Sequence, residues 1–87
     1  MSVKMEVFSG DPPCSSCSDL LNLADEYQKK FKDNLEVIKR VGKEAMAKFN
    51  EYKLGCTPTT VINETIRIEG ICPSRNTLDN ALIKAGL

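Results

Sequence analysis

The sequence lacks histidine and tryptophan, and its charged side chains cancel, with 12 basic against 12 acidic residues. Without histidine, the chain has neither the commonest general base near neutral pH nor the commonest nitrogen ligand for zinc. A net charge of zero provides no overall field that would attract nucleic acid or an anionic membrane. No apolar run approaches the roughly 18 residues of a transmembrane helix. We therefore expect a protein that binds neither nucleic acid nor membrane and recognises its partners by direct contact.

A length of 87 residues fits one domain, over residues 1–87. This domain contains four cysteines. A secreted chain of this size would use four cysteines as a disulfide framework. Here Met1 to Lys4 leads directly into a predicted strand, without the basic and apolar pattern of a secretory leader. We expect a cytoplasmic location, a reduced compartment and a catalytic role for a cysteine pair.

Hydrophobic periodicity predicts the order strand, helix, strand, helix, strand, strand, helix. The expected strands span residues 3–8, 35–41, 59–62 and 66–68, and the expected helices span about 14–32, 43–53 and a last segment that begins between 73 and 77. A helix joins the first two strands, so they should be parallel, whereas the short connection 63–65 should make the last two antiparallel. Pro73 suits the first position of the last helix. The pattern indicates one layered α/β domain.

Cys14 and Cys17 lie three residues apart where the first strand gives way to the first helix. Backbone N–H groups and the positive end of the helix dipole stabilise a thiolate at such a position. Extending the apolar face of Leu20 and Ala24 backward reaches Cys17, which should therefore be buried, while Cys14 should reach solvent. We assign Cys14 as the nucleophile and Cys17 as the resolving thiol, with Ser15 and Ser16 as expected hydrogen-bond donors to the reactive sulfur.

Three features together resemble the thioredoxin superfamily: Cys14-Ser15-Ser16-Cys17, the step Thr57-Pro58 before the third strand, and Gly70 after the fourth. In length and in its direct passage from strand to motif, the chain is most similar to a small glutaredoxin-like protein. The resemblance implies a thioredoxin-like fold, βαβαββα, with a mixed four-stranded sheet flanked by three helices. It also implies a cis bond before Pro58, beside the redox-active pair. The residues that it places around a bound substrate are Thr57, Pro58, Pro13, Ser15, Ser16, Gly70 and Ile71.

The chain also departs at four places from the proteins that it resembles. Pro13 stands where thioredoxins have a tryptophan, and the buried acid of their first strand would fall near Phe8. Ser15-Ser16 replaces the Pro-Tyr of glutaredoxins, and the segment from Gly70 to Ser74 keeps one glycine of their Gly-Gly-x-Asp turn. The chain thus lacks most of the groups with which glutaredoxins hold glutathione. We expect a poor glutathione-dependent enzyme whose partner is a protein or another low-molecular-weight thiol.

Cys56 and Cys72 should lie near the rim of the Cys14 site if this fold is correct. The simplest interpretation is that each packs as a small buried hydrophobic residue. Alternatively, one of them forms a second disulfide or supplies a third metal ligand. The basic residues Lys29, Lys30, Lys32, Lys39 and Arg40 are interleaved with acidic ones and indicate a solvated face.

The sequence therefore predicts a thiol–disulfide oxidoreductase that acts through the Cys14–Cys17 pair. It would need no cofactor beyond that redox-active disulfide. Its partners would be disulfide-containing proteins or low-molecular-weight thiols, together with a reductase or small-thiol electron donor, and it should be a monomer. The alternative is an iron–sulfur or metal carrier that uses the same cysteines as ligands. A redox-inactive interaction module is less favoured, since it would not need two thiols at a helix start.

Overall fold

A four-stranded mixed sheet forms the middle layer of the molecule, in the order β2-β1-β3-β4. The computed structural model describes residues 3–10 and 14–87. The strands are β1 (Val3–Ser9), β2 (Leu35–Val41), β3 (Thr59–Ile62) and β4 (Ile66–Glu69), and the helices are α1 (Ser15–Phe31), α2 (Lys43–Glu51) and α3 (Arg75–Lys84), with a 3-10 turn at Lys32–Asn34. None of the helices in these ranges is long and apolar enough to cross a membrane.

The strand pairing is the one expected from the connections. β1 runs parallel to β2, with Val3 opposite Leu35, because α1 carries the chain back to the same end of the sheet. β3 pairs antiparallel with β1 and with β4. The predicted order of elements and the mixed α/β sheet are therefore confirmed.

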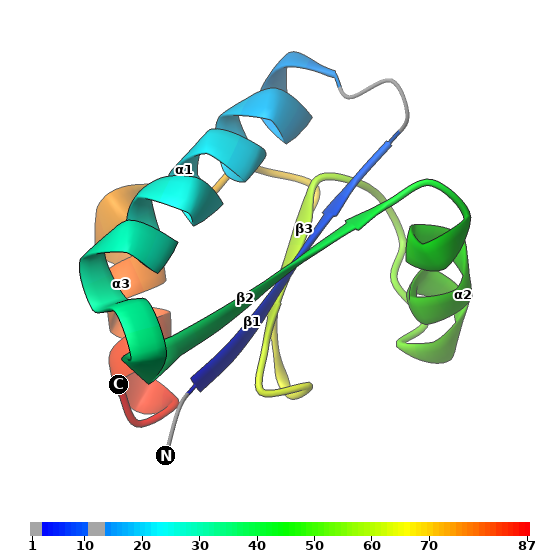
Figure 1. The fold of residues 1–87 in the computed structure, drawn as a ribbon. Coiled ribbons are helices and arrows are strands. Elements are labelled where there is room, and N and C mark those ends of the chain that lie inside the picture. Colours follow the sequence, from blue (N-terminus) through cyan, green and yellow to red (C-terminus); the bar gives the residue numbers. More distant parts are fainter. Residues whose placement is uncertain (1–2, 11–13) are drawn as a thin grey trace.

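Helices cover both faces of this sheet (Figure 1). α1 and α3 lie on one face and α2 lies on the other. Alternation along β1 sends Val3, Met5 and Val7 into the core under α1 and α3. Phe8 instead joins a second core under α2, whose other buried members are Ala45, Tyr52, Leu54 and Val61. The two cores hold the ends of β1 and α1 in fixed positions, and the two cysteines lie where those ends meet.

The last helix, α3, begins at Arg75, within the predicted range of residues 73 to 77. The expectation that Pro73 is its first residue is wrong, because Ser74 is the N-cap. The Ser74 hydroxyl accepts a 3.2 Å hydrogen bond from the Thr77 N–H, which satisfies one of the unpaired donors of the first turn. A serine that can cap thus determines the boundary, and the proline precedes it.

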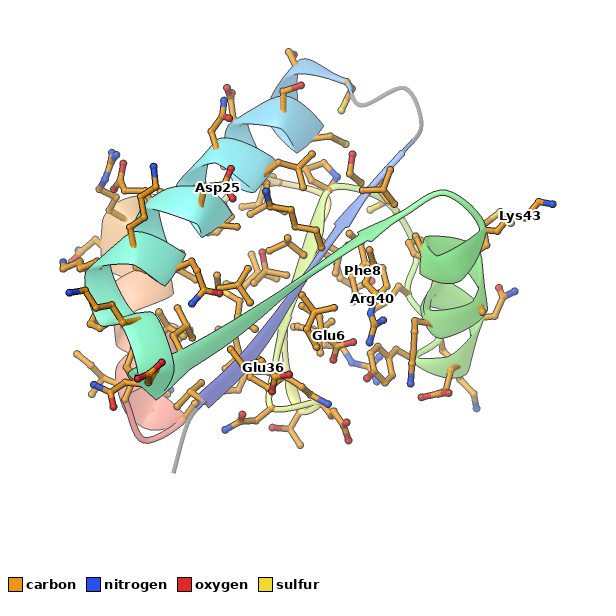
Figure 2. All side chains as sticks on the ribbon, in the orientation of Figure 1. Glu6, Phe8, Asp25, Glu36, Arg40 and Lys43 are labelled. Atoms are coloured by element: carbon orange, nitrogen blue, oxygen red, sulfur yellow. The ribbon has the colours of Figure 1, made fainter. Side chains whose placement is uncertain are left out.

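Alternation along β1 places Glu6 on the opposite face of the sheet from Met5 and Val7, and its side chain is completely buried there. It lies on the α2 face of the sheet, with Arg40 of β2 beside it (Figure 2). Arg40 Nε and Nη2 donate to Glu6 Oε2 at 3.1 and 3.0 Å. The expectation of a solvated basic face is therefore wrong for Arg40, whose side chain is only 13% exposed. Lys39, by contrast, is exposed and pairs with Asp25 of α1.

Candidate active site at the start of helix α1

Cys14 caps the helix that carries Cys17. Its backbone is extended, with φ −73° and ψ 175°, and α1 begins at the next residue. Cys14 Sγ accepts a 3.3 Å hydrogen bond from the Cys17 N–H, in the place where a serine or aspartate oxygen usually caps a helix. The Cys14 carbonyl accepts from the Ser18 N–H at 2.8 Å and starts the helical ladder. The Cys14 sulfur is thus held by the backbone of the helix that it caps.

The two sulfurs lie 2.9 Å apart in very different surroundings. Cys14 is exposed, whereas Cys17 is only 1% exposed. The predicted burial of Cys17 is confirmed, because it continues the face of α1 that buries Leu20 and Ala24. A partner in solution can therefore contact the first sulfur but not the second.

Hydrogen bonds stabilise a negative charge on the Cys17 sulfur. Burial raises the pKa of the Cys17 thiol, but hydrogen bonds from the Cys14 thiol and from the Gly10 and Cys14 backbones, with the Ser9 side chain, lower it to about 7. Near neutral pH the Cys17 sulfur can therefore carry the negative charge that disulfide exchange requires of an attacking sulfur.

Ser9 and Gly10 are site residues that the sequence analysis missed. Ser9 is the last residue of β1 and is only 3% exposed. The sequence did indicate this position. Alternation along β1 puts Val3, Met5 and Val7 on the face of the sheet that α1 covers, and one further step puts Ser9 on that face. The predicted strand ended one residue too early, at Phe8.

The step before β3 contains the expected cis bond between Thr57 and Pro58. Pro58 is buried and Thr57 is exposed. The Pro58 carbonyl accepts a 2.9 Å hydrogen bond from the Gly70 N–H, so the structure brings these two predicted site residues together. Gly70 has φ +82°, a conformation that glycine adopts readily, and the following Ile71 is 59% exposed.

Two further predicted site residues, Ser15 and Ser16, directly follow Cys14. Ser15 and Ser16 are both exposed in the first turn of α1. The backbone N–H of Cys17, rather than a serine hydroxyl, is the donor that the described residues provide to Cys14 Sγ. Pro13 lies outside the described residues.

Cys56 and Cys72 have different surroundings. Cys56 is exposed, so the expectation that it packs as a buried hydrophobic residue is wrong. Its sulfur lies against Gly70, because a Cβ added to that glycine would be 3.0 Å from Cys56 Sγ. Cys72 is half-buried, and burial together with the charge of Asp19 raises the pKa of its thiol.

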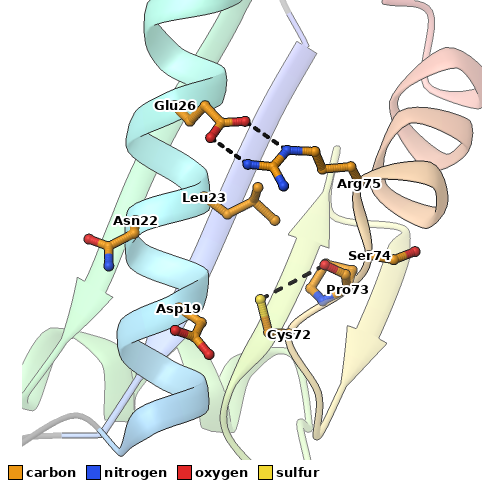
Figure 3. A pocket seen from close by; sticks show the side chains of 8 residues that line it. All are labelled: Asp19, Asn22, Leu23, Glu26, Cys72, Pro73, Ser74 and Arg75. Carbon is orange, nitrogen blue, oxygen red and sulfur yellow. Dashed lines mark hydrogen bonds and ion pairs between the residues drawn. The ribbon is translucent and has the colours of Figure 1, made fainter.

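Cys72 lines a pocket of about 280 Å³ between α1 and the segment that enters α3 (Figure 3). Across this pocket the Arg75 guanidinium donates two hydrogen bonds to the Glu26 carboxylate, of 2.9 and 2.6 Å. All four thiols are free. Within residues 3–10 and 14–87, no three cysteine or acidic side chains gather in a way that could hold a metal ion, which does not favour the carrier alternative.

Comparison with known proteins agrees with this fold. Residues 3–83 match the thioredoxin domain family. The chain is 35% identical over 82 residues to a probable thioredoxin of Methanothermobacter thermautotrophicus, and 34% identical to that of Methanothermobacter marburgensis, with 94% of each chain covered in both cases.

Solved structures extend the likeness at lower identity. A malarial protein matches with a TM-score of 0.81 at 19% identity, over 100% of both chains. Thioredoxin-2, a component of the protein secretion machinery of the malaria parasite, matches with a TM-score of 0.79 at 20% identity, over 95% of this chain and 82% of its own. At such identities the likeness shows the fold alone, which is thioredoxin-like.

Proposed function

The chain belongs to the thioredoxin family of thiol–disulfide oxidoreductases, and we propose that it reduces disulfides of partner proteins through Cys14 and Cys17. The observation that carries this assignment is the pairing of one exposed and one buried sulfur at 2.9 Å. An accessible thiolate can attack a partner. A hidden thiol in contact with it can complete the reaction without competing for the partner's disulfide.

The reaction has two exchange steps. The Cys14 thiolate attacks one sulfur of the partner disulfide, the partner's S–S bond breaks, and its other sulfur leaves as a thiolate that takes up a proton. Cys17 then loses its proton and attacks Cys14 Sγ. The mixed disulfide breaks, the second partner sulfur leaves and is protonated, and a Cys14–Cys17 disulfide remains. Two electrons have passed to the partner, and an external thiol or dithiol reductant must return two electrons for the next cycle.

Substrate contacts would come from the exposed residues around Cys14. Thr57 and Ile71 are exposed on two loops that the Pro58–Gly70 hydrogen bond joins. Ser15 and Ser16 are exposed on the first turn of α1. These positions support the proposal that the partner polypeptide crosses this end of the sheet.

Single-turnover reduction of a protein disulfide tests the assignment of the two thiols. Cys14→Ser should abolish reduction, whereas Cys17→Ser should accumulate a mixed disulfide that intact-mass analysis detects. Cys72→Ser is the matched control, since that thiol is half-buried and lies outside the pair, and it should react as the native protein does. Turnover that survives in Cys14→Ser would disprove the assignment.

A dithiol, rather than glutathione, is our proposed electron donor. The Ser74 hydroxyl is already engaged as the α3 cap, and Ile71 offers an apolar side chain where a polar group would be needed to hold the tripeptide. Each missing hydrogen bond to a buried polar group costs on the order of 1 to 3 kcal/mol. Glutathione with its reductase should therefore regenerate the dithiol far more slowly than a dithiol donor at matched driving force. Equal rates would contradict this choice of donor but not the proposed reaction.

A further inference from the structure

A second pocket, of about 490 Å³, lies between the end of β1, the start of α2 and the loop before Pro58. It is lined by Ser9, Gly10, Gly42, Lys43, Ala45, Met46, Phe49 and Thr57. Among the lining residues that the structure describes, Lys43 at the start of α2 (Figure 2) carries a charge. A volume of this size falls within the roughly 300 to 1,000 Å³ of typical ligand sites.

This pocket shares residues with the redox site. Ser9 and Gly10 form part of its wall and also provide hydrogen bonds to the Cys17 sulfur. Thr57, on the opposite wall, directly precedes Pro58. A polypeptide whose sulfur reaches Cys14 must cover the neighbouring surface, and this pocket is part of that surface.

The walls are apolar and include an unusually exposed side chain. Met46 is 66% exposed, although it stands beside the buried Ala45. Phe49 forms a fixed part of the wall, because its ring packs edge-on against the buried Phe8 with centroids 6.3 Å apart. A flexible methionine over a rigid aromatic wall can adapt to apolar side chains of several shapes.

We propose that this pocket receives a large apolar side chain, such as leucine or phenylalanine, that neighbours the target cysteine in the partner polypeptide. This inference rests on the proposed function and specifies its substrate class. Charge supports the choice, since Lys43 at the rim repels a lysine or arginine. The pocket of Figure 3 is the poorer acceptor for an apolar group, because Asp19, Glu26 and Arg75 line it.

The test uses short peptides with one cysteine joined by a disulfide to 2-mercaptoethanol, and with leucine, phenylalanine, serine, glutamate or lysine directly before or after that cysteine. The second-order rate constant for their reduction by the pre-reduced protein is divided by the rate constant with dithiothreitol, which removes the intrinsic reactivity of each peptide. Leucine and phenylalanine peptides should react at least about 10-fold faster than serine peptides, and lysine peptides slowest.

Two exposed side chains provide matched variants. Met46→Lys should reduce the leucine-to-serine ratio to about 1 to 3, whereas Ile83→Lys, equally 66% exposed but on α3, should preserve it. Circular dichroism establishes that both variants fold. Lys43→Glu provides a second test, because it should reverse the order of the glutamate and lysine peptides.

The peptide assay distinguishes failure of the pocket inference from failure of the proposed function. If the native protein reduces every peptide with the same normalised rate constant, the pocket inference is wrong and the proposed function stands. Failure to reduce any peptide would remove the proposed function itself. A dimer at assay concentration that Met46→Lys dissociates would show that the occupant is a second copy of this chain, and would also overturn the inference.

Discussion

The Tyr52 hydroxyl donates a 2.9 Å hydrogen bond to Glu6 Oε1, across 46 residues of sequence. This contact ties the end of α2 to the middle of β1, inside the core beneath α2. The other carboxylate oxygen, Oε2, receives two hydrogen bonds from Arg40. Glu6 is thus a buried charge whose two oxygens are both occupied, and it anchors the segment that leads from α2 toward Thr57 and Pro58.

Glu6→Gln should lower the free energy of unfolding by about 3 kcal/mol, because it replaces a fully buried carboxylate that accepts hydrogen bonds from both Arg40 and Tyr52. Denaturant titration at neutral pH measures the change. Glu64→Gln is the control: it breaks an exposed ion pair with Lys4 and should cost less than about 1 kcal/mol. Equal effects of the two substitutions would contradict a structural role for the buried pair.

Tyr27 and Tyr52 should both ionise well above the ordinary value. Burial raises the pKa of each phenol to about 12, and hydrogen bonds to Asp79 and Glu6 add to this effect. Unfolded tyrosine ionises near pH 10, so the unfolded state loses these protons first and stability should fall between about pH 10 and pH 12. The chain has two tyrosines and no tryptophan, so tyrosinate absorbance reports them directly. Absorbance that rises around pH 10 while the protein remains folded would be inconsistent with their burial.

Thiolate absorbance of the reduced protein should rise as pH increases through about 7, the value to which hydrogen bonds lower the pKa of Cys17. A protein with Cys56→Ser and Cys72→Ser removes the background of the other two thiols. Alkylation of this protein should label Cys14 first, because Cys14 is exposed and Cys17 is buried, and peptide mass mapping locates the label. An absorbance that rises only near the ordinary thiol value of about 8.5, or a first label on Cys17, would count against the geometry.

Gly70→Ala should destabilise the protein by about 1 to 3 kcal/mol. The residue has φ +82°, which costs energy for any side chain, and the new methyl group would press on Cys56 Sγ at 3.0 Å. Gly55→Ala is the matched control, because its methyl group would meet only the end of the Glu69 side chain at 3.7 Å. Adding Cys56→Ala should restore only the part of the loss due to crowding, which a double-mutant cycle separates. No loss in Gly70→Ala would contradict the left-handed conformation.

The element order could be predicted because each segment carries its own periodic signal. The same local pattern predicted that Cys17 is buried, because Cys17 continues the apolar face of α1. The role of Glu6 could not be predicted in this way, since alternation only says that it faces away from Val7. Its burial depends on Arg40 and Tyr52, which come from distant parts of the sequence and meet it only in the fold.

The pocket beside α2 could not be predicted from the sequence, for a related reason. Met46 follows the buried Ala45 in α2, and within residues 3–10 and 14–87 this helix is the only one on its face of the sheet (Figure 1). The outer part of α2 therefore stays open, and Met46 is mostly exposed. Burial of a helix face depends on its neighbours, which periodicity does not specify.

Cys14 is at once the N-cap of α1 and the exposed sulfur of the pair. In the reduced protein, its sulfur accepts a hydrogen bond from the Cys17 N–H and so caps the first turn of the helix. Oxidation draws this sulfur into a disulfide, so whatever the cap adds to the folding free energy of the reduced form also favours the acceptance of electrons by the disulfide. Substitutions elsewhere that strengthen or weaken the first turn of α1 would therefore change the reduction potential without touching either sulfur.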